Sequence, residues 1–505
     1  MSPTPDLTRR QLLATAGAGA AALFLESSGV QAQAQPPRAA AARPILFTHT
    51  TLQTPAGQLD DVALVVENGV IAAIGPTEQL QPRYPNADVY DGRGKAIFPG
   101  LINCHSHLNA TIERGFNEDF GFPNSLTLAV SPNSLLSPEE RVLMSVIGMI
   151  EALKTGTTTI IENVGGIARE AKAVADVGLR TVFAESFNDR EGAGVMSAEL
   201  LAKSEKPTYS AKLREDGMQR IADLHTAWHG KDNGRISVFP AVAHAENCSG
   251  DLLKAVRDFA EKHDLGYTIH TNQSTWEADY MVKWHGLRPV EYMAKHDFLG
   301  PRFIAAHCRY VSANEIALLG RSKTIVSHQP GMAGNRGANP PIPELRAAGA
   351  TIAMGTDNNT NDVFTVLRVG LITERMRRND ATPGLLPQPE DIFEDCTLGG
   401  AMAVRQSKTI GSLEVGKKAD LIVVNTQKAH LVPSGRILST WIHNGQPSDV
   451  ESSMVDGKFV MRAGKVLTLD EAALVAEADK VGQRVWKRVR EANGGIPIPG
   501  RTSRR

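Results

Sequence analysis

Two histidines separated by one residue, His105 and His107, have the types and spacing that most directly suggest metal binding in this sequence. In an extended segment, residues two apart point to the same side, so both imidazoles can reach one ion. The spacing alone is weak evidence, because a chain with 14 histidines contains such a pair by chance about one time in three. Further ligands must therefore come from elsewhere in the chain.

Additional imidazoles and one carboxylate follow short apolar segments. Each comes at the C-terminal end of a segment that reads as a buried strand, which is where barrels of alternating strands and helices place their chemistry. In chain order they are His244, His270, His307, His328 and Asp357. Three imidazoles and one carboxylate hold a zinc-like metal and leave one position for water. The ligands that we predict are His105, His107, His270 and Asp357.

The predicted centre holds one divalent metal. Zinc is the metal we expect, and iron, cobalt or manganese suit the same ligands. Asp357 can also take the proton of the attacking water, and His307 can hydrogen-bond the attacking oxygen. The alternatives are that Asp357 is a helix cap and that His307 is a buried histidine with its own partners.

These residues can meet only if the strands that carry them form a closed sheet. Eight apolar runs between about residues 97 and 357 alternate with helical segments, two of which begin with capping boxes at Ser137–Glu140 and Ser312–Glu315. Continuous apolar strands are buried on both faces, as in parallel sheets. We therefore predict a (β/α)8 TIM barrel, in which AIFPGLINCH, residues 96–105, is the first strand and the polar stretch 188–234 is an insertion.

The two ends of the chain share another pattern. Short alternating strands occur at about 44–95 and again from 409, with hairpin turns at Asn68-Gly69 and Asp456-Gly457. We predict one small β-sandwich built from both ends. The expected division is a signal peptide at 1–34, the N-terminal part of the sandwich at 35–95, the barrel at 96–408, the C-terminal part of the sandwich at 409–470, and a helix and tail at 471–505.

The N-terminal segment is typical of a twin-arginine export signal. Arg9 and Arg10 precede a small apolar run, and Ala32-Gln33-Ala34 is a cleavage motif. The alternative, an N-terminal membrane anchor, is disfavoured because the run is short and rich in Ala and Gly. We expect a periplasmic or secreted protein with no membrane span.

The composition of the chain limits the classes of molecule that it is expected to bind. The net charge is −1 and the pI is about 6.9, so no basic field exists to attract nucleic acid, and a small molecule is the expected partner. Four scattered cysteines without CxxC spacing argue against a disulfide framework, and we expect them to be free.

Several motifs together resemble the amidohydrolase superfamily, in its deaminase and chlorohydrolase branch, which includes cytosine and guanine deaminases and triazine hydrolases. They are FPGLINCHSH, the strand-end His270, AAHC, AMGTDNN and IGSLEVGKKADLIVVN, and the resemblance covers about 44–470. It implies a metal-dependent barrel, a composite β-sandwich and a homo-oligomer. It also implies that the four predicted ligands bind one catalytic metal and that His307 contacts water or substrate. ISVFPAVAH contains no lysine for carboxylation, which favours a single metal.

Gln273 departs from the pattern that this resemblance implies, because the deaminases carry glutamate three residues after the matching histidine. A glutamine cannot titrate and can only orient substrate or water. Three explanations remain open: a substrate that needs less proton delivery, another acid, or lost catalysis. The candidate acids are Glu162, Glu185 and Glu277.

Other residues are candidates for substrate binding. His244 and His328 end strands that face the predicted mouth, although a buried histidine with backbone partners is the alternative for His244. Asn358 resembles the triazine chlorohydrolases, although it could be a turn residue. Arg336, in a glycine-rich loop, could meet a carboxylate or carbonyl of the substrate, or could be solvated.

The sequence thus predicts a metal-dependent hydrolase that uses metal-activated water on a non-peptide C–N bond. The bond would belong to an amide, carbamate, urea or cyclic amidine in a small heterocyclic molecule. Deamination or dehalogenation of an N-heterocycle is the alternative, and a non-catalytic metal-binding relative is a third possibility.

Overall fold

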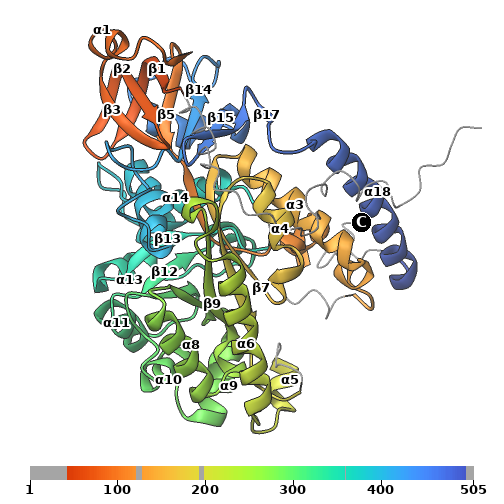
Figure 1. Ribbon diagram of the computed structural model, residues 1–505. Coiled ribbons are helices and arrows are strands. Elements are labelled where there is room, and N and C mark those ends of the chain that lie inside the picture. Colours follow the sequence, from red (N-terminus) through yellow and green to blue (C-terminus); the bar gives the residue numbers. More distant parts are fainter. Residues whose placement is uncertain (1–42, 121–127, 193–197, 359, 496–505) are drawn as a thin grey trace, which may run out of the picture. The chain divides into compact units, whose positions relative to one another are not determined.

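The strands form two separate sheets, an eight-stranded parallel one and a nine-stranded mixed one (Figure 1). The computed structural model describes residues 43–120, 128–192, 198–358 and 360–495. The predicted export signal at 1–34 lies outside these residues. All the elements discussed below belong to one unit that begins at Ala42.

The parallel sheet is the predicted barrel. Its strands pair in chain order, each with the next. They are β6 (Leu101–Ser106), β7 (Thr157–Val164), β8 (Arg180–Phe187), β9 (Ile236–His244), β10 (Tyr267–Thr271), β11 (Phe303–His307), β12 (Ile325–His328) and β13 (Thr351–Met354). A bridge between Ser106 and Asp357 brings the last strand back to the first. The ring is therefore nearly closed, and closure places the first and last predicted ligands side by side.

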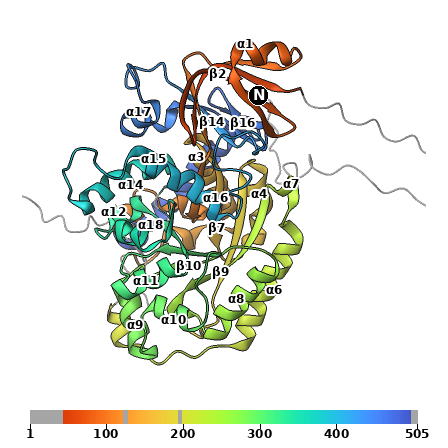
Figure 2. The ribbon, with the colours of Figure 1, turned by 90° about the vertical axis from the view of Figure 1, so that its left-hand side faces the viewer.

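Helices cover the outside of the barrel, as Figures 1 and 2 show for α6 and α8 beside β9. The helices are α1 (Thr77–Leu80), α2 (Asn117–Phe120), α3 (Pro138–Lys154), α4 (Ala171–Asp176), α5 (Ala198–Ala202), α6 (Ala211–Trp228), α7 (Lys231–Gly234), α8 (Gly250–Lys262), α9 (Thr275–His285), α10 (Pro289–Lys295), α11 (Ala313–Arg321), α12 (Pro330–Asn335), α13 (Ile342–Ala348), α14 (Val363–Arg378), α15 (Pro389–Glu394), α16 (Gly400–Ala403), α17 (Ile437–Asn444) and α18 (Glu471–Asn493).

Two sequence expectations need correction. The stretch 188–234 is not simply an insertion, because it contains α6, an 18-residue barrel helix that buries only Gly217, Ile221 and Leu224. Its polar composition follows from this narrow buried stripe. The stretch 96–105 is two strands, since β5 (Lys95–Pro99) belongs to the mixed sheet. Gly100 lies between the two strands. A side chain does not fit there, because a Cβ would lie 2.0 Å from the Thr158 hydroxyl oxygen.

The mixed sheet is built from both ends of the chain, as predicted. Its order is β17-β16-β15-β14-β5-β1-β2-β3, with β4 also paired to β1. The strands are β1 (Ile45–Thr54), β2 (Gly57–Glu67), β3 (Val70–Pro76), β4 (Asp88–Asp91), β5, β14 (Leu421–Asn425), β15 (Val450–Val455), β16 (Lys458–Arg462) and β17 (Lys465–Val466). Antiparallel pairing of β14 with β5 joins the two halves.

Local signals in the sequence account for several of these boundaries. The predicted capping box at Ser137 is formed, with the Ser137 hydroxyl accepting from the Glu140 N–H, and Ser312 caps α11 in the same way. The Asp456-Gly457 turn joins β15 to β16 with φ of 50° and 75°. Two consecutive left-handed residues are what a tight hairpin requires.

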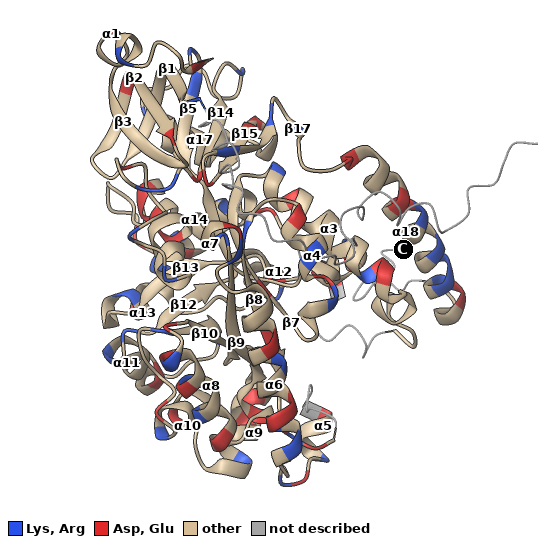
Figure 3. Cartoon of the chain, in the orientation of Figure 1, with Lys and Arg blue, Asp and Glu red and all other residues tan. Residues whose placement is uncertain are grey.

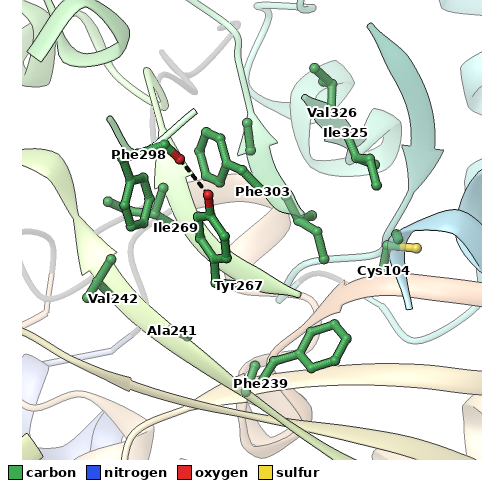
Figure 4. Packing of buried hydrophobic residues seen from close by; sticks show 14 of the residues in the cluster. Cys104, Phe239, Ala241, Val242, Tyr267, Ile269, Phe298, Phe303, Ile325 and Val326 are labelled. Atoms are coloured by element: carbon green, nitrogen blue, oxygen red, sulfur yellow. Dashed lines mark hydrogen bonds between the residues drawn. The ribbon is translucent and has the colours of Figure 1, made fainter. Parts of the chain in front are cut away.

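The barrel core is packed with apolar and aromatic side chains, part of which Figure 4 shows. Tyr267 begins β10 between Phe298 and Phe303, with ring centroids 4.8 and 5.7 Å away. Its hydroxyl donates to the Phe298 carbonyl at 2.8 Å, so the one polar atom of this buried ring is satisfied. Such packing fixes β10, whose other end carries His270.

Cys104, Cys248, Cys308 and Cys396 are all free and buried, as expected. Acidic and basic side chains are interspersed over the elements (Figure 3). Among the described residues, no helix is both long and apolar enough to cross a membrane.

Candidate metal centre

His107 and His270 face each other with their Nε2 atoms 3.3 Å apart. The Nδ1 of His107 donates to the Asn163 carbonyl at 2.6 Å, and that of His270 donates to the Ala243 carbonyl at 2.7 Å. A neutral ring that donates through Nδ1 has a bare Nε2, so two lone pairs point at each other. This contact is unfavourable unless a cation lies between the rings. Nitrogens bound to one tetrahedral zinc are about 3.3 Å apart, which this pair matches.

His105 and Asp357 complete the cluster. The donor atoms of His105, His107 and His270 lie within 4.8 Å of one another, as do those of His105, His307 and Asp357. Asp357 Oδ1 is 3.5 Å from His107 Nε2. Both ring nitrogens of His105 and Oδ2 of Asp357 are buried without a hydrogen-bond partner in the described part of the chain. Buried polar atoms need partners, so these residues fit a bound metal.

Burial keeps the imidazoles neutral, which is the form that binds metals. It lowers the pKa of His105, His270 and His307 well below the ordinary range, and the neighbouring histidines lower it further. The carbonyls that hold Nδ1 of His107 and His270 also fix the orientation of these two rings. The cluster is thus preorganised for a cation.

The backbone around the cluster is held in uncommon conformations. His307 and Asp357 have φ of 77° and 64°, in the left-handed region that non-glycine residues rarely adopt. Gly355 brings β13 against His105, because a Cβ there would lie 2.7 Å from the His105 backbone nitrogen. Strain of this kind persists only where the surrounding structure imposes it, and it clusters at functional sites.

A cavity of about 320 Å³ opens onto the cluster. Its lining residues are His107, Asn109, Ala110, Glu113, Asn133, His244, His270, Gln273, Asp357 and Asn358. His244, Gln273 and Asn358, three of the predicted substrate-binding residues, are therefore at the cavity wall. His105 and His307 are almost fully buried and are not among the lining residues.

His244 stacks on His270, with ring centroids 4.5 Å apart and planes inclined by 21°. Its Nδ1 lies 4.0 Å from Glu246 Oε1, and its donor atom is within 4.8 Å of both Glu246 and Glu277. Burial lowers the pKa of His244 to about 4. A neutral His244 can offer a substrate one donor and one acceptor.

His328 and Arg336, also predicted to bind substrate, are not among the residues that line this cavity. His328 lines a separate small cavity with Asn339 and Thr373. The Arg336 guanidinium donates to Asn358 Oδ1 at 3.4 Å. Arg336 thus contacts a lining residue. Burial lowers the pKa of its guanidinium and the nearby Asp357 carboxylate opposes that shift, so its contact with substrate stays a prediction.

The three acids considered as replacements at Gln273 are structural anchors. Glu162 accepts from the Leu108 N–H at 3.0 and 3.1 Å, and Glu185 accepts from the Gly166 N–H. Glu277 accepts from the N–H groups of Asn272 and Gln273 at 2.9 and 2.7 Å. None of these carboxylates lines the cavity. Glu277 is not a solvated helix residue either, since it is fully buried.

Glu113 and Asn133 line the cavity but were not predicted. They lie in the segment between β6 and α3, and no motif marks them. Their position after a strand that ends in two ligands is the one available signal, because loops at this end of a barrel line its site.

Comparison with known proteins agrees with this geometry. Residues 96–460 match the amidohydrolase family, and residues 63–87 match the imidazolonepropionase-like composite domain of bacteria. A 5'-deoxyadenosine deaminase of Methanobrevibacter smithii is 32% identical over 83% of this chain and 92% of its own.

Two solved structures share the fold. An adenosine deaminase from Xanthomonas campestris with bound zinc superposes with a TM-score of 0.78, at 26% identity over 88% of this chain and 98% of its own. The zinc complex of an atrazine chlorohydrolase from Arthrobacter aurescens has a TM-score of 0.75, at 20% identity over 87% of this chain and all of its own. The chain belongs to the amidohydrolase family.

Proposed function

We propose that this member of the amidohydrolase family, a hydrolase of C–N bonds other than peptide bonds, acts on a small heterocyclic molecule. The bond that it cleaves would belong to an amide, carbamate, urea or cyclic amidine. The observation that carries this proposal is the position of Gln273, which lines the cavity beside His270. It gives the wall a side chain that can hold a carbonyl or an N–H but cannot deliver a proton.

The residues of the cluster would hold a divalent metal, which supplies Lewis acidity and makes water nucleophilic near neutral pH. Asp357 can take a proton at Oδ2, which has no hydrogen-bond partner among the described residues and lies 3.9 Å from His307 Nδ1. His307 can then hydrogen-bond an oxygen that gains negative charge. Gln273 and His244 orient the substrate from the wall.

Removal of an exocyclic amino group is the second candidate reaction. It is favoured by relatives that are named 5'-deoxyadenosine deaminase and adenosine deaminase. It requires a proton donor for leaving ammonia; the three glutamates considered for this role do not line the cavity, whereas Glu113 does. Dehalogenation remains a third candidate, supported by Asn358 at the wall.

Zinc is the metal that we propose, because the two solved relatives described above contain it. We also propose export by the twin-arginine route, from Arg9, Arg10 and the cleavage motif. The periplasm or exterior would then be the working compartment. Association into a homo-oligomer remains a proposal from the resemblance.

A product-resolved assay tests the proposed reaction. Zinc-loaded protein is incubated with a matched panel of lactam, carbamoyl, amino and chloro heterocycles, and ammonia, carboxylic acid, amine and chloride are measured separately. We expect ring-opened or decarbamoylated products with no ammonia from the amino compounds. Ammonia from amino heterocycles as the main product would make deamination the reaction and overturn the proposal.

A further inference from the structure

Arg309 is a buried cation beside the candidate active site, and the proposed mechanism gives it no role. It follows His307 by two residues, after the end of β11, and is 9% exposed. A guanidinium carries five N–H donors in one plane. Three backbone carbonyls, those of Gln273, Arg336 and Ala338, accept hydrogen bonds from it. These carbonyls belong to two different loops, so one side chain ties the loops together.

The contact with Gln273 continues the pairing of β10 with β11 beyond the ends of both strands. The Asn272 carbonyl accepts from the Tyr310 N–H at 3.1 Å, and the next carbonyl, that of Gln273, accepts from Arg309 Nη1 at 3.2 Å. The N–H of Gln273 donates to Glu277 Oε2 at 2.7 Å. Both polar groups of the Gln273 backbone are therefore held by buried side chains. The two contacts fix the place from which the Gln273 side chain enters the cavity wall.

The other contacts of Arg309 hold the loop that follows α12. Its Nε donates to the Ala338 carbonyl at 2.9 Å, and its Nη2 donates to the Arg336 carbonyl at 3.4 Å. The Arg336 side chain in turn donates to Asn358 Oδ1 at 3.4 Å. Asn358 and Gln273 both line the cavity. Arg309 thus connects two lining residues that lie on different loops.

We propose that Arg309 is a positioning residue that determines which substrates the cavity accepts, because it fixes Gln273 relative to the loop 336–338. This inference rests on the proposed function, in which Gln273 orients the substrate. A guanidinium suits the task, since its donors point in several fixed directions, whereas a lysine ammonium is a single flexible point of charge. Loss of the contact would shift the Gln273 amide, and a displacement of about 1 Å can cost about 100-fold in rate.

A double-mutant cycle separates this role from a general loss of structure. The values of kcat and KM are measured for Arg309→Lys, Gln273→Ala and the double variant, with two substrates of the heterocycle panel. Arg309→Lys alone should lower kcat/KM about 10-fold or more and change the ratio between the two substrates. In the Gln273→Ala background the same change should cost less than about 3-fold, because residues that act through one contact are not additive. Equal costs in both backgrounds, or an unchanged ratio, overturn the proposal.

Arg302→Lys is the matched control. Arg302 lies just before the opposite end of β11 and also donates to a backbone carbonyl, that of Leu265, at 3.3 Å. Its effect on kcat/KM should be small and additive with that of Gln273→Ala. Arg309→Gln, which retains N–H donors without the charge, repeats the cycle if Arg309→Lys does not fold.

Hydrogen exchange followed by mass spectrometry tests the contact without turnover. At equal zinc content, the Gln273 amide should exchange at least several-fold faster in Arg309→Lys than in wild type or Arg302→Lys. Unchanged exchange overturns the proposal. The product assay identifies the reaction separately, so the proposed function can fail while the positioning role of Arg309 stands.

Discussion

Gln273 lies at the cavity wall, and its backbone N–H is held by buried Glu277 at 2.7 Å. The side chain is therefore placed by the fold next to the cluster that would hold the metal. At this position a carboxylate could shuttle a proton to a leaving nitrogen, whereas an amide can only donate or accept hydrogen bonds. The proposed function therefore depends on the side-chain chemistry of residue 273.

Gln273→Glu should raise ammonia release from amino heterocycles. General acid–base catalysis is worth about 10²- to 10⁴-fold, so a gain of at least about 10-fold is expected even with imperfect geometry. Steady-state ammonia assays measure it, with Gln483→Glu on the exposed side of α18 as the control. If no substrate in the panel changes its rate, residue 273 does not act at the reacting atoms.

Glu246 and Glu277 are two buried carboxyl groups near each other and near His244. Burial raises the pKa of Glu277 from 4.5 to about 8. Burial and the charge of Glu277 together raise the pKa of Glu246 well above its ordinary range. The folded chain therefore retains protons that the unfolded chain releases above pH 4.5. The stability contributed by this region falls as the pH rises from there to about 8.

Glu246→Gln should stabilise the protein at high pH and change little at low pH. At pH near 8 it removes a charge that is repelled by Glu277, and at pH near 5 the replaced carboxyl is already neutral. We expect an apparent Tm about 2 °C above wild type at the higher pH and no gain at the lower one. An equal shift at both pH values would show that packing, not ionisation, sets the difference.

At the scale of elements, α18 is the support of the cavity wall that carries Glu113. Val481, Val485 and Val489 of this helix pack against apolar residues of the segment between β6 and α3. The Trp486 indole adds a hydrogen bond to that segment. Trp486 and Ile112 are more than 370 residues apart in the sequence. A helix near the end of the described chain thus stabilises the segment that carries Glu113 to the cavity wall.

Val485→Ala should therefore weaken substrate binding without loss of metal. Val485 is fully buried, and its truncation costs about 1–3 kcal/mol of folding stability at this contact. KM for the best substrate should rise several-fold while zinc per chain stays constant. Val475→Ala on the same helix is the control, because Val475 is 48% exposed. A loss of zinc in Val485→Ala would mean that α18 supports the ligands themselves.

The strands of the barrel could be predicted because each is a continuous apolar run that ends in a polar residue. The clustering of the four predicted ligands could be anticipated because closure of a parallel barrel brings strand ends together, and their binding of a metal stays a prediction. What the sequence did not reveal depends on long-range contacts. Helix α6 buries few residues, so its sequence is mostly polar and indicates an insertion. The anchoring roles of Glu162 and Glu277 depend on backbone N–H groups whose positions no spacing specifies.

At the scale of the whole molecule, one buried ion pair connects the barrel to the mixed sheet. Arg180, at the start of β8, donates from Nε and Nη2 to both oxygens of Asp420, at 2.7 and 3.1 Å. Asp456, in the β15–β16 turn, lies 3.7 Å from the same guanidinium. Arg180 is fully buried and Asp420 nearly so, so neither charge can be satisfied by water if the other is removed.

Arg180→Met should destabilise the protein by about 3–5 kcal/mol, because it leaves a buried, uncompensated carboxylate. Denaturant unfolding at neutral pH measures the loss. Arg93→Met removes an exposed pair with Asp91 and should cost less than about 1 kcal/mol. A cost for Arg180→Met as small as that of the control would show that the connection is carried by packing alone.

The central claim is that the His105, His107, His270 and Asp357 cluster holds the metal on which hydrolysis depends. The most direct measurement is the metal content of purified wild type and of His105→Ala, taken together with activity, with exposed His443→Ala as the control. We predict one divalent metal per chain in wild type and in His443→Ala, and loss of metal and activity together in His105→Ala. Full activity in protein without metal, or retention of metal by His105→Ala, would contradict the account.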